Sequence, residues 1–360
     1  MVKKSNKHVE HNDGKQPLCT IPEMPLRPLD ANVNDQRASL IRVTEKKWVN
    51  GTVLHYYFHD EPSTWRGGDD QKDAVRNAFS EWKQLGIGLE FIEVTDPQDA
   101  EIRIGFDQND GSWSYVGRDN IDYATDPDER TMNFGWDLTT DYGHDTALHE
   151  IGHAIGFSHE HQNPKSGIQW DEAAVIDYFS GSPNYWSEEQ TRHNILRKLN
   201  ENETDGSDWD NNSIMHYQFP SGLIIKPEAY QNNPLIPDPG LSSTDIVEAL
   251  HFYPGLDINL PELRPWESHR IRIDAGRQID FLINPKYSRE YTMQTFGKMD
   301  TVMVLFEEIN GENVYYDGDD DSGTSFNAKI TARLVRGRSY VLRIRLYYAE
   351  QKGEGALMMW

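Results

Sequence analysis

Apolar and polar residues change their spacing along the chain in ways that predict distinct elements. Over residues 52–58, 89–94 and 102–106, apolar side chains fall at the spacing of strands, largely in alternation with polar ones, and we expect three strands there. Between the first two, apolar residues recur at the spacing of one helix face, which predicts an amphipathic helix over residues 74–85. The order strand, helix, strand, strand indicates an α+β region in the first part of the chain.

The pattern changes after Pro254. Pro261 and Pro265 predict a linker, and short runs rich in β-branched and aromatic residues follow it without a convincing helical period. These runs predict strands over residues 270–274, 302–306 and 340–344. We therefore expect a small all-β sandwich over residues 262–360.

The first residues of the chain show neither the helical nor the strand spacing of apolar residues. Residues 1 to about 36 are polar and carry Pro17, Pro22, Pro25 and Pro28, which is typical of a segment that is extended over a surface or disordered. The expected organisation is an extended N-terminal segment, residues 1–40, that can serve as a pro-segment, a first domain over residues 41–255 and an accessory sandwich over residues 256–360.

One short stretch carries the chemistry of a metal site. His149 and His153 are four residues apart, so on a helix their rings face the same point. Glu150 follows the first histidine and can reach a water on that metal without being a ligand. Gly156 tolerates the left-handed backbone that ends a helix, which lets His159 return to the metal as third ligand.

Three protein ligands leave a fourth position open, which distinguishes a catalytic zinc ion from a closed structural one. A zinc ion lowers the pKa of a bound water to about 7, and Glu150 can accept its proton during attack on a carbonyl. The alternative is that these histidines are ordinary residues of an amphipathic helix, since short motifs recur by accident. The extension through Gly156 and His159 argues against that alternative.

Together with the histidine motif of residues 149–159, two further stretches of the sequence resemble the metzincin clan of zinc endopeptidases. Residues 213–217, Ser-Ile-Met-His-Tyr, match the methionine turn of the clan, and Glu160 after the third histidine resembles the astacin subfamily. The resemblance implies that Met215 forms an apolar floor beneath the metal and that Tyr217 is an extra ligand that swings away to steady the reaction intermediate. It also implies that Glu160 can pair with a new amino terminus. By itself, a buried methionine is more often part of a core, and Tyr217 can be a core or cleft-wall tyrosine.

Other segments extend the resemblance over residues 41 to 254. Residues 111–117 resemble the edge strand that forms the upper rim of the astacin cleft, with the substrate rim at Trp113, Ser114, Tyr115 and Val116. Residues 241–254 resemble the closing helix, with Ser242 or Ser243 as its cap. The implied fold is an α+β metzincin domain, in which a twisted, mostly parallel sheet and two long helices place zinc in the cleft.

The sequence departs from the astacin pattern in two places. Ser112 stands in the rim strand where astacins usually have a cysteine, so packing must hold what a disulfide would brace. Residues 162–168 also lack the arginine and aspartates common in animal members. These differences favour a disulfide-free microbial branch of the family.

Residues 300–306 and 317–323 resemble the bacterial pre-peptidase C-terminal domain, which accompanies secreted proteases. This resemblance implies an extracellular bacterial protein. The aspartates of residues 317–323 can bind calcium, since hard cations prefer carboxylate oxygens, but their spacing is not that of an EF-hand. A solvated acidic hairpin loop is the favoured interpretation.

Cys19 is the single cysteine of the chain, and it lies between Pro17 and Pro22. Residues 17–23 resemble the pro-segment of matrixins, another metzincin subfamily, in which a cysteine blocks zinc. A thiolate in the fourth position would exclude the catalytic water and keep the enzyme latent. The other interpretation is an unpaired cysteine in an extended tail, and both stay open at this point.

Charge and composition limit the partners. Lys and Arg number 35 against 59 Asp and Glu, a formal charge of −24 that should repel nucleic acids and anionic membranes. No apolar run approaches the ~20 residues of a membrane span, so we expect a soluble protein, and we favour a monomer. Residues 1–16 have no apolar core of a signal peptide, which leaves the export route open.

The expected function is a zinc-dependent endopeptidase, with one catalytic Zn²⁺, that hydrolyses protein or peptide substrates. The alternative is a zinc-containing binding or adhesion module in which catalysis is vestigial. Glu150 argues against this alternative, because a non-catalytic module has no chemical need for that carboxylate.

Overall fold

The computed structural model describes residues 16–24, 46–199, 208–256, 259–309, 312–348 and 351–360, and everything below refers to these residues. Its first region contains a five-stranded sheet in the order β2-β1-β3-β5-β4. The strands are β1 (Val53–Phe58), β2 (Glu90–Glu93), β3 (Ile102–Gly105), β4 (Trp113–Ser114) and β5 (Met132–Asn133). All pairs are parallel except β4 with β5, which confirms the prediction of a twisted, mostly parallel sheet.

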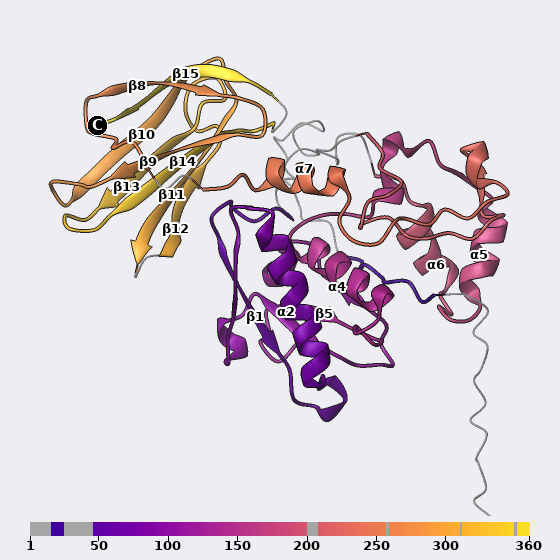
Figure 1. Ribbon diagram of the computed structural model, residues 1–360. Helices are drawn as coiled ribbons and strands as arrows, with labels where there is room; N and C mark the ends of the chain where they lie inside the picture. Colours follow the sequence, from indigo (N-terminus) through magenta and orange to yellow (C-terminus); the bar gives the residue numbers. More distant parts are fainter. Residues whose placement is uncertain (1–15, 25–45, 200–207, 257–258, 310–311, 349–350) are drawn as a thin grey trace, which may run out of the picture.

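Two long helices pack beside this sheet, α2 (Asp69–Gln84) and α4 (Asp141–Ala154) (Figure 1). The apolar face of α2 is buried as its spacing predicts, although the helix begins five residues before residue 74. Gly68 precedes it, and the acidic Asp69 and Asp70 occupy its first turn, where they complement the helix dipole. The Nε1–H of Trp82 donates to Leu148 O at 3.0 Å, which ties α2 to α4.

The region after the histidine motif forms a second, smaller core. Its elements are β6 (Gln169–Trp170), α5 (Glu172–Ser180), α6 (Glu188–Thr191), a π-helical turn (Arg192–Leu196) and β7 (Ile224–Lys226). Helix α7 (Ser243–Phe252) closes the domain. Ser242 is its cap: its side chain accepts from Asp245 N, and the Asp245 side chain accepts from Ser242 N in return.

The last third of the described chain is an all-β sandwich, as predicted. Two antiparallel four-stranded sheets, in the orders β13-β10-β15-β8 and β12-β11-β14-β9, share one core. The strands are β8 (Ser268–Ile273), β9 (Gln278–Ile283), β10 (Arg289–Gly297), β11 (Thr301–Ile309), β12 (Glu312–Asp319), β13 (Lys329–Leu334), β14 (Tyr340–Leu346) and β15 (Gly353–Met359). In Figure 1, the chain runs from α7 into the sandwich.

The segment predicted as a linker is in fact attached to the sandwich. Leu263 N donates to Leu282 O at 2.8 Å, and Trp266 N donates to Met359 O at 2.7 Å. The prolines Pro261 and Pro265 themselves donate nothing, but residues that follow them pair with β9, at the edge of one sheet, and with the last residue of β15 in the other.

Among the described residues, none of the helices combines the length and the apolar character that crossing a membrane requires.

Candidate metal centre and active site

The motif histidines lie where one helix ends. His149 and His153 are one turn apart in α4, and the helix ends at Ala154. Gly156 has a φ of 105°, and Phe157 N donates back to Gly152 O at 2.9 Å, so the chain reverses there as predicted. This reversal brings His159 Nε2 to 3.1 Å from His153 Nε2.

Backbone carbonyls orient the first two rings. The Nδ1 atoms of His149 and His153 lie 2.7 Å from Ile214 O and Phe157 O. Because a carbonyl can only accept, each Nδ1 carries the proton and each Nε2 presents a lone pair. The Nε2 atoms of His149 and His153 therefore present lone pairs toward His159 Nε2, and three imidazole nitrogens that converge in this way fit a cation.

Cys19 is the fourth member of this cluster. Its Sγ lies 3.1 Å from His149 Nε2, 3.4 Å from His159 Nε2 and 3.9 Å from His153 Nε2. The four ligand atoms all lie within 4.8 Å of one another, and all four residues are buried. Three imidazoles and one thiolate are a donor set typical of tetrahedral zinc.

The N-terminal segment is held in the cleft from both sides. Leu18 N and Ile21 N donate to the side-chain oxygens of Asn184 and Asn194, each at 2.9 Å. On the opposite side, Thr20 N donates to Ser112 O at 3.0 Å, and Thr20 pairs in parallel with Trp113. These contacts position Cys19 over the histidines.

Burial governs the protonation of this cluster. It raises the pKa of the Cys19 thiol well above its ordinary value, and the nearby Glu150 carboxylate raises it further. It lowers the pKa of His149 to about 4 and the pKa values of His153 and His159 well below their ordinary value. The imidazoles are thus neutral and able to ligate, while a thiolate at this place requires a compensating cation.

Glu150 and Tyr217 flank the same point. Glu150 is fully buried, and burial raises the pKa of its carboxyl group. Tyr217 donates its hydroxyl hydrogen to Cys19 O at 2.8 Å and lies 3.1 Å from Cys19 Sγ. A cavity lined by Cys19, His149, Glu150 and Tyr217 continues toward Tyr142.

The methionine turn lies directly under α4. A Cβ added to Gly152 would lie 2.4 Å from Met215 Sδ, so the absence of a side chain at Gly152 lets the methionine approach the helix. Glu160 N donates to Met215 O at 2.9 Å. The Glu160 carboxylate accepts from Asp210 N and Asn163 Nδ2, and burial raises its pKa to about 7.

No local pattern in the sequence pointed to the residue that anchors this turn, Asp245. The carboxylate of Asp245 accepts from Ser213 Oγ at 2.6 Å and from Ile214 N at 2.8 Å. Asp245 lies in the first turn of α7, where an acidic residue is favourable on local grounds alone. Its contact with residues more than 30 positions away is a tertiary feature without a local signal.

The predicted rim is partly strand. Only Trp113–Ser114 forms β4, at the edge of the sheet, and Tyr115 N still donates to Thr131 O at 3.0 Å. Val116 is buried.

Three neutral imidazoles beside a buried carboxylate, at the end of a helix on an α+β fold, define a candidate metallohydrolase site. The family model for astacin, a family of peptidases, matches residues 40–223, just over half of the chain, and the chain belongs to this family.

The chain is also similar to individual proteins. The chain is 27% identical over 206 residues to "Zinc metalloproteinase nas-36" of Haemonchus contortus, a match that covers 54% of this chain and 29% of that protein. The solved structure of myroilysin is 32% identical with a TM-score of 0.52, and the match covers 59% of this chain and 97% of that one. A pre-peptidase C-terminal domain of a Bacillus anthracis collagenase matches 29% of this chain at 13% identity, with a TM-score of 0.26. The chain thus spans less than a third of the length of the nas-36 protein.

Proposed function

We propose that this protein is a zinc-dependent endopeptidase that hydrolyses peptide bonds of protein substrates. The observation that carries the proposal is the convergence of three buried Nε2 atoms beside the Glu150 carboxylate. Membership of the astacin family supports it.

The chain's own residues have distinct parts in this reaction. His149, His153 and His159 would hold zinc, which when bound polarises a carbonyl and makes water acidic enough to lose a proton near neutral pH. Glu150 would take that proton and return it to the leaving nitrogen. Tyr217 donates a hydrogen bond to the oxyanion, as it now does to the Cys19 carbonyl.

The substrate would bind as an extended strand along β4. Support comes from the position of β4 at the edge of the sheet and from the pairing of Thr20 with Trp113 on that edge. A peptide that adds to a sheet edge is held by main-chain hydrogen bonds, which suits a protease that acts on varied sequences. The rim we propose is Trp113, Ser114, Tyr115 and Val116.

We also propose that Cys19 keeps the enzyme latent. Its Sγ occupies the position opposite the three Nε2 atoms, and Asn184, Asn194 and Ser112 hold its segment in the cleft. Peptide cannot enter while this segment pairs with β4. Release of residues 1–40 would open both the metal and the rim.

Unprocessed Cys19→Ala protein tests the latch against unprocessed parent. We expect the variant to hydrolyse casein at least about tenfold faster, since loss of the thiol frees the fourth position. Asn184→Ala serves as the matched control, because it removes one hydrogen bond that holds the segment in the cleft but keeps the thiol. Its rate of hydrolysis should increase less. Equal rates for the unprocessed parent and Cys19→Ala would refute the latch.

The activity itself is tested on protein from which the N-terminal segment has been removed. We expect one zinc ion per chain, hydrolysis of casein or gelatin, loss of activity with a chelator and its return with zinc. Bound zinc without hydrolysis would favour the binding or adhesion module instead. A bacterial culture that secretes the protein would support the extracellular location that the sandwich resemblance implies.

A further inference from the structure

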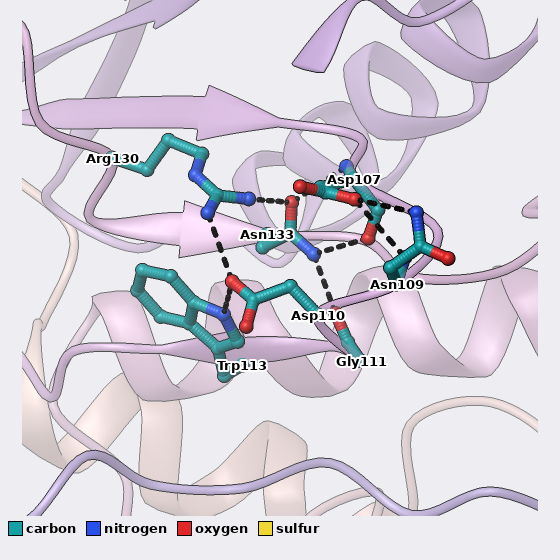
Figure 2. A network of polar contacts seen from close by, with 7 residues as sticks. All are labelled: Asp107, Asn109, Asp110, Gly111, Trp113, Arg130 and Asn133. Carbon is teal, nitrogen blue, oxygen red and sulfur yellow. Dashed lines mark hydrogen bonds and ion pairs between the residues drawn. The ribbon is translucent and has the colours of Figure 1, made fainter. Parts of the chain in front are cut away.

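We propose that Asp110, Arg130 and Asn133 position the rim strand β4 for peptide binding, an inference that rests on the proposed function. With Trp113 we call these residues the rim brace. They contact no metal ligand in the described structure; they act through the backbone on which substrate would pair. Figure 2 shows the network.

Strand β4 has little support of its own. It contains two residues, which pair with Met132 and Asn133 of β5. Its other edge is the one that Thr20 contacts. A strand this short is marginal without further contacts, and Cys19 is the only cysteine, so an internal disulfide cannot brace it.

Asn133 closes the loop that leads into β4. Its side-chain oxygen accepts from Asp107 N at 2.9 Å and from Arg130 Nη1 at 2.6 Å. Its Nδ2 donates to Asp107 O at 3.0 Å and to Gly111 O at 2.5 Å. The amide thus makes all the hydrogen bonds it can make, at a fully buried position, and joins both ends of the loop over residues 107–111 to β5.

Arg130 and Asp110 continue this network to the rim itself. Arg130 Nη2 lies 2.9 Å from Asp110 Oδ2, and the same oxygen accepts from Trp113 Nε1 at 3.1 Å. The guanidinium also lies over the rings of Trp65 and Trp113, with 4.3 and 5.6 Å from its carbon to the ring centroids. The rim tryptophan is therefore held by a hydrogen bond and by a stacked cation.

The backbone around the brace leaves space for it. A Cβ added to Gly105 would lie 2.4 Å from Arg130 Cδ, so the glycine at the end of β3 lets the arginine cross the sheet. At Gly135 an added Cβ would lie 2.5 Å from the backbone of Gly111. Gly135 N in turn donates to Ser112 Oγ at 3.0 Å, next to the carbonyl that Thr20 now contacts.

These contacts have a functional consequence. A peptide that pairs with β4 gains affinity from main-chain hydrogen bonds only if the strand is already ordered, since ordering it on binding costs free energy. The brace supplies that order without touching the reacting atoms. Its loss should weaken binding of long substrates and leave the chemical step almost unchanged.

Asp110→Asn and Asp110→Ala test this inference in protein freed of its N-terminal segment. We expect KM for a peptide that spans the rim to rise about three- to tenfold, with kcat within about twofold of parent. A short substrate that does not reach β4 should show a smaller rise. Arg130→Lys, which keeps the charge but not the fork, should recover part of the affinity that Arg130→Gln loses.

The matched control is Asp73→Asn, which removes one carboxylate from an exposed ion pair with Arg76 on α2 and changes net charge equally. Equal KM values for Asp110→Asn and Asp73→Asn would overturn the inference, as would a fall in kcat at constant KM. Trp113→Phe, which removes the indole N–H together with the five-membered ring that carries it, replaces Asp110→Ala if that variant does not fold.

Hydrogen exchange keeps this test separate from the proposed function. The amides of residues 112–115 should exchange faster in Asp110→Ala than in Asp73→Asn, whether or not the parent cleaves peptides. An inactive parent with faster exchange in the variant would refute the proposed function alone. Unchanged exchange would refute the brace.

Discussion

Replacement of Asp245 by alanine should weaken both the fold and the metal site. The carboxylate of Asp245 accepts from Ser213 Oγ, Ile214 N and Ser242 N, at 2.6, 2.8 and 2.8 Å. Ile214 O in turn accepts from His149 Nδ1 at 2.7 Å. One buried side chain therefore holds the turn whose carbonyl orients His149, a proposed metal ligand.

The magnitude follows from these contacts. Each buried donor left without an acceptor costs about 1–3 kcal/mol, so three of them give an upper range of several kcal/mol. Burial raises the pKa of Asp245, which means that the native carboxylate already carries a desolvation cost that alanine removes. We expect a net loss of about 3 kcal/mol, or about 6–12 °C in Tm for a domain of this size.

The assay is thermal unfolding with and without zinc, together with a zinc titration. Asp245→Asn keeps one acceptor oxygen and should lose about half as much. Ser242→Ala removes the cap together with the hydrogen bond from Ser242 Oγ to Asp210, and should lose about 1 kcal/mol. Zinc affinity should fall about tenfold in Asp245→Ala because His149 loses its fixed orientation. A Tm and zinc affinity equal to those of parent would refute this account of the turn.

Two further predictions concern ion pairs. Asp280→Ala should lower the free energy of unfolding, measured by chemical denaturation, by about 3–5 kcal/mol, because it leaves the Arg343 side chain, which is 3% exposed, charged and unpaired. The variant that also replaces Arg343 by Met should recover much of this free energy. No recovery would contradict the reasoning. Arg76→Gln should cost only about 0.2–1 kcal/mol at pH 7, because both partners are more than a third exposed. Arg76 lowers the pKa of Glu93 in the folded protein. The stabilisation from this pair is therefore present above the pKa that Glu93 has in the unfolded chain, and it is lost as the pH falls through the pKa of folded Glu93. A stability difference between parent and Arg76→Gln that grows in acid would contradict this reasoning.

Local patterns predicted the parts of the fold that depend on local physics. The helix face of α2 follows from its apolar spacing, and the chain reversal at Gly156 follows from glycine's tolerance of positive φ. Of the two serines that the sequence offered as the cap of α7, the structure has Ser242. The spacing of His149 and His153 likewise follows from helix geometry, whereas His159 reaches them through the chain reversal at Gly156.

Local sequence patterns could not predict the tertiary contacts. The helices α5 and α6 lie in residues 162–212, whose conformation no period in the sequence predicted. The hydrogen bonds of Asn133 join residues 22 to 26 positions away, and nothing local distinguishes this asparagine from any other. The position of Cys19 over the histidines was suggested by resemblance to another subfamily, because contacts across 130 residues leave no local signal.

The most direct test of the central claim is hydrolysis of casein by zinc-loaded Cys19→Ala protein, with and without the additional change Glu150→Gln. Glutamine keeps the size of the side chain but cannot accept the proton. The account predicts one zinc ion per chain in both proteins and a rate at least about a hundredfold lower with glutamine. Comparable hydrolysis by both proteins would contradict it.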